Sequence, residues 1–232
     1  MKKLSYIILT LALVSAVSIN ASAQGQSRSV SGFTSVASSG PFNVHIKIDG
    51  NESVRVDADA DAIDDIVTVV ENNTLKIKFK DREWQHRNLR KAEVYVEAKS
   101  LNTLINAGSG SIKVDGMITA GEFKAVLSGS GNITTSVKAD GLHAVISGSG
   151  SISLSGNAND ANIVVTGSGE IEGKNLKTGS AKVVITGSGN VYVAAEKSVS
   201  AHITGSGSVI YSGSASVIDS RYTGSGRVSR AD

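Results

Sequence analysis

A run of aspartates is the first pattern in the chain that could bind an ion, because carboxylate oxygens are the ligands that calcium prefers. Its members are Asp57, Asp59, Asp61, Asp64 and Asp65. A calcium loop that starts at the first of them needs Gly at its sixth position and Glu at its twelfth, where the chain has Ala62 and Thr68. We therefore predict no metal site here. The run is expected to form a solvated acidic turn, or a short capped helical turn near Ile63 and Ile66.

A second cluster combines cations with an aromatic side chain between residues 81 and 91. Its members are Arg82, Trp84, His86, Arg87 and Arg90. Guanidinium groups beside aromatic rings could hold an anionic sugar, which makes this segment a candidate ligand loop. The alternative is a charged hairpin loop whose Trp84 covers the end of the fold.

The other residue types that carry chemistry form no catalytic or cofactor-binding pattern. The chain has no Cys, which excludes disulfides, thiolate metal ligands and a cysteine nucleophile. Its four histidines, His45, His86, His143 and His202, are too scattered to form a metal site by spacing. The glycines match neither the dinucleotide fingerprint nor the phosphate loop. We therefore predict no catalytic residue, no metal and no cofactor.

The first residues have the features of an export signal. Lys2 and Lys3 precede the apolar stretch 4–19, and Ala21-Ser22-Ala23 provides the small residues that a signal peptidase accepts. We expect a signal peptide over 1–23, with a membrane anchor as the alternative. Cleavage would remove Lys2 and Lys3, so that 21 of the 23 Lys and Arg residues remain, equal in number to the 21 Asp and Glu residues. The mature chain is then neutral, which argues against a nucleic-acid partner. It is expected to be periplasmic, surface-associated or secreted, without an integral membrane segment.

The second half of the chain repeats one tripeptide at a regular step. Gly-Ser-Gly begins at residues 108, 129, 148, 167, 187, 205 and 224, at intervals of about 19 residues. Apolar, mostly β-branched residues stand two positions before and two positions after most copies, as Ile146 and Ile152 do. This alternation predicts short strands. Strands repeated at a fixed period predict a β-solenoid, in which each repeat is one coil and the apolar columns stack into a core.

One column departs from this alternation. The third position before the tripeptide should face away from the core, yet it is apolar in five copies and polar at His202 and Arg221. The five apolar members are Ile105, Val126, Val145, Val164 and Val184. A strand that is apolar on both faces usually has both faces covered. We therefore predict that this column is a contact surface, covered by residues 33–103, by a second copy of the chain or by a foreign partner.

The first half of the chain has strand patterns without the tripeptide. Alternating runs at 42–48, 53–57, 67–70, 75–79 and 93–97 are separated by turn candidates at 49–51 and 71–73. A solenoid leaves unpaired backbone at its ends and needs caps there. We predict a flexible segment over 24–32, a β cap or irregular first coils over 33–103, and the repeat solenoid over 104–232.

This pattern resembles the bacterial family called putative auto-transporter adhesin, head GIN domain. The resemblance extends from about residue 33 to residue 232 and rests on Phe33, Gly-Pro-Phe at 40–42, the strands up to Phe79 and the Gly-Ser-Gly coils. The triplet Gly-Ile-Asn is not present, and the nearest text is Ile105-Asn106-Ala107-Gly108. The resemblance implies a right-handed parallel β-helix in an exported protein, often from Bacteroidetes.

Together these patterns predict an exported, non-enzymatic, all-β protein that acts as a structural or adhesive surface. Its expected partner is a protein or a glycan at the cell surface, and self-association remains open. The alternative is a β-helix that binds or acts on polysaccharides, which would need clustered carboxylates or a basic catalytic residue. A water-ordering surface is a third option, suggested by the rows of Ser and Thr around the tripeptides.

Overall fold

The computed structural model describes residues 25–80 and 89–231. These residues form β-strands and one 3₁₀ turn, η1 (Ile63–Asp65), and no α-helix occurs among them. The strands stack into coils of about 19 residues, which make a β-solenoid of about seven turns. The all-β solenoid predicted from the repeat is therefore confirmed. The predicted signal peptide, 1–23, lies outside the described residues.

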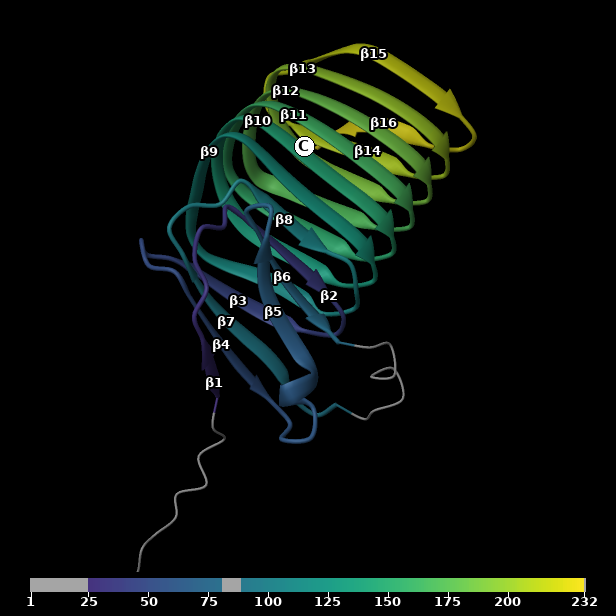
Figure 1. Ribbon diagram of the computed structural model, residues 1–232. Helices are drawn as coiled ribbons and strands as arrows, with labels where there is room; N and C mark the ends of the chain where they lie inside the picture. The colour runs from purple at the N-terminus through teal and green to yellow at the C-terminus, as the bar shows by residue number, and fades with distance from the viewer. Residues whose placement is uncertain (1–24, 81–88, 232) are drawn as a thin grey trace, which may run out of the picture.

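Long strands that bend around the core build the regular part of the stack. They are β9 (Ser111–Gly129), β10 (Asn132–Gly148), β11 (Ser151–Gly167), β12 (Glu170–Gly187) and β13 (Asn190–Gly205). Each pairs in parallel with the next, and Figure 1 shows them as curved ribbons lying side by side. Equivalent residues of successive repeats pair in register, so that Ile146 lies between Leu127 and Val165.

The core consists of the side chains that alternate strand positions send inward. Ile133, Ile146 and Val165 have no exposed surface. Burial of one such side chain stabilises the fold by about 1.5–3 kcal/mol. Because every coil contributes the same positions, the core is a continuous column along the solenoid axis.

The Gly-Ser-Gly turns let the coils approach closely at one edge. Gly187 has a φ of +124°, which L side chains rarely adopt. The carbonyl oxygen of Gly167 in the preceding coil accepts hydrogen bonds from the backbone N–H groups of Ser188 (2.9 Å) and Gly189 (3.1 Å). A side chain at the first glycine of the tripeptide would push the backbones of successive coils apart.

The N-terminal coils are stacked in an order that differs from their order in the chain. β2 (Ser35–Ser39) lies between β6 (Thr74–Phe79) and β8 (Thr103–Asn106), parallel to both. β3 (Asn43–Ile48) lies between β7 (Ala92–Ala98) and β9 in the same way. The coil made by β2 and β3 is therefore inserted between two coils that follow it in the chain.

Antiparallel strands end the stack on the N-terminal side. β4 (Ser53–Ala58) pairs with β7, and β5 (Ile66–Glu71) pairs with β6 through a turn at Asn72 and Asn73, which both have positive φ. β1 (Gln26–Arg28) adds to the free edge of β4. The sequence predicts a flexible segment over 24–32, whereas residues 26–28 are a strand because β4 offers them an unpaired backbone edge.

The last coil closes the other end of the molecule (Figure 1). It contains β15 (Ser216–Thr223) and β16 (Arg227–Arg230), which pair in parallel with β13 and β14 (Ser208–Ser212). Val217, Ile218 and Tyr222 of β15 are exposed, because no further coil follows them among the described residues. Among these residues, no helix is long and apolar enough to cross a membrane.

Candidate functional site

Neighbouring strands at the N-terminal end send polar side chains to one outer face. Their inward positions are apolar and buried, as are Val44 and Ile46 of β3 and Val94 and Val96 of β7. Because side chains alternate along a strand, the residues between them point outward. We call these outward residues the N-terminal polar face: Ser53, Arg55, Asp57, Glu93, Tyr95, Glu97, Asn43, His45, Lys47, Ser111, Lys113 and Asp115.

The centre of the N-terminal polar face is a row of side chains that cross the strands. Pairing places Arg55 beside Tyr95, Tyr95 beside His45, and His45 beside Lys113. The rings of Tyr95 and His45 stack with centroids 5.1 Å apart and planes inclined by 19°. The Arg55 guanidinium carbon lies 4.3 Å from the centre of the Tyr95 ring. These contacts fix the rings side by side, while Tyr95 stays 36% exposed to solvent.

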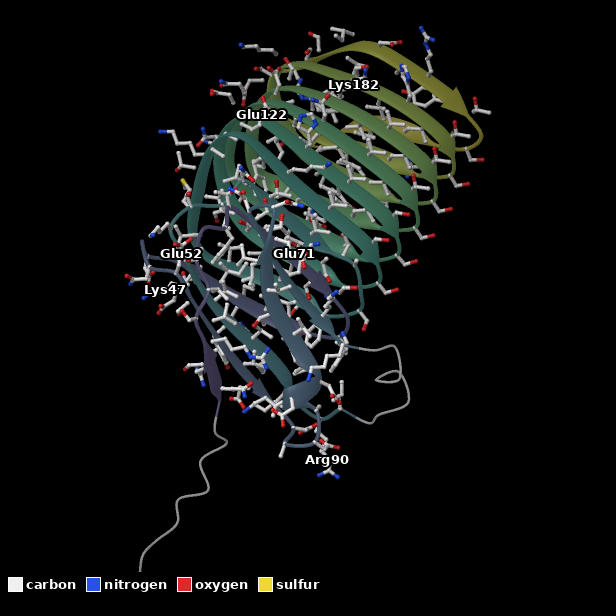
Figure 2. All side chains as sticks on the ribbon, viewed as in Figure 1. Lys47, Glu52, Glu71, Arg90, Glu122 and Lys182 are labelled. Carbon is white, nitrogen blue, oxygen red and sulfur yellow. The ribbon has the colours of Figure 1, made fainter. Side chains whose placement is uncertain are left out.

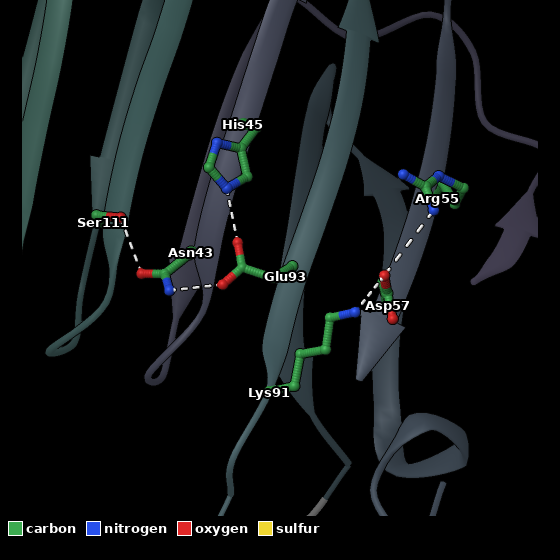
Figure 3. A network of polar contacts seen from close by, with 7 residues as sticks. All are labelled: Asn43, His45, Arg55, Asp57, Lys91, Glu93 and Ser111. Carbon is green, nitrogen blue, oxygen red and sulfur yellow. Dashed lines mark hydrogen bonds and ion pairs between the residues drawn. The ribbon is translucent and has the colours of Figure 1, made fainter. Parts of the chain in front are cut away.

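A hydrogen-bonded network supports this row along one side (Figure 3). Glu93 accepts a hydrogen bond from Asn43 (2.9 Å) and contacts Nε2 of His45 at 2.6 Å. Asn43 in turn accepts a hydrogen bond from the Ser111 hydroxyl at 2.9 Å. The network joins β7, β3 and β9, so that the position of each polar group depends on its neighbours.

Beside this network, an ion pair holds the carboxylate of β4. Lys91 Nζ donates to Asp57 Oδ2 at 2.7 Å, and Arg55 Nη1 lies 4.0 Å from the same oxygen. The pKa of Lys91 is raised, first because its ammonium donates this hydrogen bond to Asp57. The Asp57 carboxylate, which is itself buried, therefore faces two cations.

Most residues of the N-terminal polar face line a cleft of about 840 Å³. Its charged lining residues are Arg28, Lys47, Arg55, Lys113, Glu97 and Asp115. Cations outnumber anions, which favours an anionic group in the cleft. Lys113 forms no ion pair or hydrogen bond with another described residue, and is therefore available to a ligand. In the described part of the chain, no three His, Asp or Glu residues are grouped closely enough to hold a metal ion.

The predicted ligand loop is described only at one end. Arg82, Trp84, His86 and Arg87 lie outside the described residues. Arg90 is exposed at the N-terminal end of the molecule, where Figure 2 shows it pointing away from the strands. Its backbone N–H donates to Asp59 at 2.7 Å. Asp59 therefore accepts a backbone hydrogen bond. In the same acidic run, η1 forms the short helical turn that was expected, although no side chain caps it.

The predicted apolar column lies on the outer face of the strand segments that precede the Gly-Ser-Gly turns. Ile105, Val126, Val145, Val164 and Val184 pair in register across β8 to β12. Val164 is 36% exposed and the others are half-buried. β2 pairs with β8, which places Ala37 beside Ile105 at the N-terminal end of the column. Whether a partner covers the column stays a prediction.

The sequence does not identify the N-terminal polar face as a site. It indicates only that His45 belongs to a strand. The available signal was the alternation in each strand, because 43–47, 53–57, 93–97 and 111–115 all place charged or hydrogen-bonding residues at every second position. That pattern gives the outward direction of each side chain. It does not give the order of the four strands.

The family model for the putative auto-transporter adhesin, head GIN domain, matches residues 32–215. The chain belongs to this family. The resemblance deduced from the Gly-Pro-Phe run and the Gly-Ser-Gly coils is therefore confirmed. Membership of an adhesin family supports an adhesive role and points to an exported or cell-surface protein. No curated protein matches the chain.

Solved structures share the fold of this adhesin-family chain. A putative adhesin from Bacteroides fragilis NCTC 9343 has a TM-score of 0.85 and 22% identity. A putative adhesin from Parabacteroides merdae ATCC 43184 has a TM-score of 0.73 and 20% identity. A putative lipid binding protein from Parabacteroides distasonis ATCC 8503 has a TM-score of 0.71 and 23% identity. Each match covers 90% of this chain and 96% of the other.

Proposed function

We propose that the protein is an exported, non-enzymatic β-solenoid adhesin whose N-terminal polar face binds a glycan. The observation that carries this proposal is the 840 Å³ cleft, in which the row of Arg55, Tyr95, His45 and Lys113 presents polar tips from four strands. Sugar hydroxyl groups need directional hydrogen-bond partners, and this row offers donors and acceptors side by side.

Rigidity supports binding at this face. The row is fixed by ring stacking and by the network around Glu93, so that few side chains need to be ordered when a ligand binds. A stable protein partner would need about 800 Å² per side, with an apolar centre. The cleft also has apolar lining residues, but the polar row from Arg55 to Lys113 crosses it, which favours a glycan over a protein.

The carboxylates of this face are better suited to binding than to catalysis. A glycosidase needs one carboxylic acid with a raised pKa and a second carboxylate about 5–9.5 Å away. Asp57 faces Lys91 and Arg55, and Glu93 faces His45 and Asn43, so that both carboxyl groups already have partners within the protein.

One observation favours the alternative of a protein that acts on polysaccharides. On β12, the pKa of Glu170 is raised, first by a hydrogen bond with the Glu172 side chain. A hydrogen bond brings the two carboxyl groups into direct contact, whereas both glycosidase mechanisms require them to be about 5–9.5 Å apart. We therefore favour binding without hydrolysis.

A glycan-binding screen followed by an assay for released reducing ends tests this function. The protein should bind a subset of glycans and release no product from them. The variant His45→Ala with Tyr95→Ala removes the stacked rings and should weaken binding at least about tenfold. His143→Ala, on the outer face of β10, is the control and should bind as the wild type does. Binding to no glycan, or release of reducing ends, would contradict the proposal.

Export is tested separately. The lysines and small residues of 1–23 support cleavage after Ala23, and mass spectrometry of the extracellular and periplasmic fractions should then find a chain that begins at Gln24. An intact residue 1–23 segment in the mature protein would contradict cleavage.

A further inference from the structure

A second cleft adjoins the N-terminal polar face. Its volume is about 430 Å³, and it shares Val114 of β9 with the first cleft. Its polar lining residues are Thr134, Thr135, Ser136, Ser153, Ser155, Glu172, Lys174 and Asn175. The two clefts therefore meet at β9, one extending toward β4 and the other toward β12.

Strand register makes the two clefts continuous. Lys113, which ends the row in the first cleft, pairs with Thr134 of β10, and the row continues through Ser153 of β11 to Glu172 of β12. Adjacent strands lie about 4.8 Å apart. The six strand spacings from Arg55 to Glu172 therefore cover about 29 Å along the solenoid axis.

The second cleft lies where the strand register is irregular. Register shifts occur between Thr134 and Ser136, between Ser153 and Ser155, and, on the next coil, between Gly173 and Lys177. Bulges bend a strand and redirect its side chains. Because the irregularities fall on neighbouring coils, they hollow the same part of the outer surface.

The two clefts differ in chemistry. Cations outnumber anions in the first, and Lys113 has no partner among the described residues. Hydroxyl groups dominate the second, where the Ser136 and Ser155 hydroxyls lie 2.6 Å apart and the ammonium of Lys174 is 3.6 Å from Glu172. The first cleft suits a carboxylate, and the second suits neutral hydroxyl groups.

We propose that the two clefts form one groove that binds a single linear polysaccharide containing uronic acid, lying across the strands with a sugar carboxylate beside Lys113. This proposal rests on the proposed function, because it names the kind of glycan that the N-terminal polar face binds. A linear chain fits because the row from Arg55 to Glu172 presents polar groups at the spacing of the strands. An isolated sugar would occupy only one of the clefts.

Calorimetric titration with oligomers of increasing length tests the proposal. The probes are hyaluronan, oligogalacturonate and alginate oligomers, from the disaccharide upward. For at least one series, affinity should rise with length until the oligomer reaches from the first cleft into the second, and then level off. Affinity should fall as salt is added, because the contact at Lys113 is electrostatic.

Two variants separate the parts of the groove. Thr134→Val with Ser153→Ala removes hydroxyl groups from the second cleft, and should weaken the longer oligomers about tenfold while leaving the disaccharide unchanged. Lys113→Gln should weaken all lengths. The matched control is Thr166→Val with Ser147→Ala, which makes the same changes on the same two strands at exposed positions near the turns. It should bind every oligomer as the wild type does.

The outcomes distinguish this inference from the proposed function. Affinity that does not depend on length, or long-oligomer binding that survives loss of the Thr134 and Ser153 hydroxyls, would overturn the continuous groove. Absence of binding to all three acidic series would overturn the ligand class. The proposed function would still hold if the protein bound a neutral glycan and the variant His45→Ala with Tyr95→Ala lost that binding. Absence of binding to any glycan would overturn both the proposed function and this inference.

Discussion

Replacement of Gly187 by Ala should destabilise the solenoid severely, because the turn brings two backbones together. A Cβ atom built at this residue would lie less than 3.0 Å from the carbonyl oxygen of Gly167, whereas ordinary contact begins at 3.4 Å. The two coils must therefore separate by at least 0.4 Å at this point. The separation would stretch the hydrogen bonds that the Gly167 carbonyl accepts from Ser188 and Gly189.

The size of the effect follows from two terms. A non-glycine residue held at positive φ costs about 1–3 kcal/mol. Forcing an extra methyl group into a packed region costs a further 1–3 kcal/mol, approximately. Together these terms give a loss of about 2–6 kcal/mol in the free energy of unfolding. For a chain of this size, even the lower figure lowers Tm by about 4 °C.

Gly121→Ala is the matched control. An added Cβ at Gly121 of β9 meets no atom within 4 Å, and its φ lies outside the positive range. This substitution should leave stability unchanged or raise it by about 0.4–1 kcal/mol, because Ala restricts the unfolded chain. Urea denaturation followed by circular dichroism measures both variants. If Gly187→Ala unfolds at the same urea concentration as Gly121→Ala, the account of the turn is wrong.

Three further predictions concern the core, the acidic pair and the apolar column. Ile146→Asp places an unpaired charge at a position that has no exposed surface in the wild type. It should lower the free energy of unfolding, measured by urea titration, by several kcal/mol. A variant as stable as the wild type would mean that this position is not in the core. The hydrogen bond with Glu172 raises the pKa of Glu170, so that ionisation of the pair destabilises the fold as pH rises. Glu172→Gln should therefore raise Tm at neutral pH, and the gain should shrink as the pH falls through about 4.3, the ordinary pKa of glutamate. An equal gain at neutral and acidic pH would contradict this. Val145→Ser with Val164→Ser should reduce the mass measured by light scattering without unfolding the chain if a second copy covers the column. Unchanged mass, thermal stability and surface binding would show that the column is simply exposed.

Much of the architecture could be predicted from the sequence because its determinants are local. The alternation around Ile146 and Ile152 repeats at intervals of about 19 residues, and strand geometry converts this period into coils that stack in register. The same alternation gives the outward direction of His45, Arg55, Tyr95 and Lys113, since each lies between apolar neighbours.

Only the tertiary structure decided which of these outward residues meet. β3 is inserted between β7 and β9, so that His45 lies beside Tyr95 and Lys113, each of which is 50 or more residues away in the chain. β4 runs antiparallel on the far side of β7 and brings Arg55 to the same row. No local signal encodes this order, because an exposed strand edge accepts any strand of suitable pattern, and the choice depends on how the N-terminal coils pack together. The outward direction of each side chain therefore followed from the sequence, whereas the row across the strands required the strand order that only the folded chain supplies.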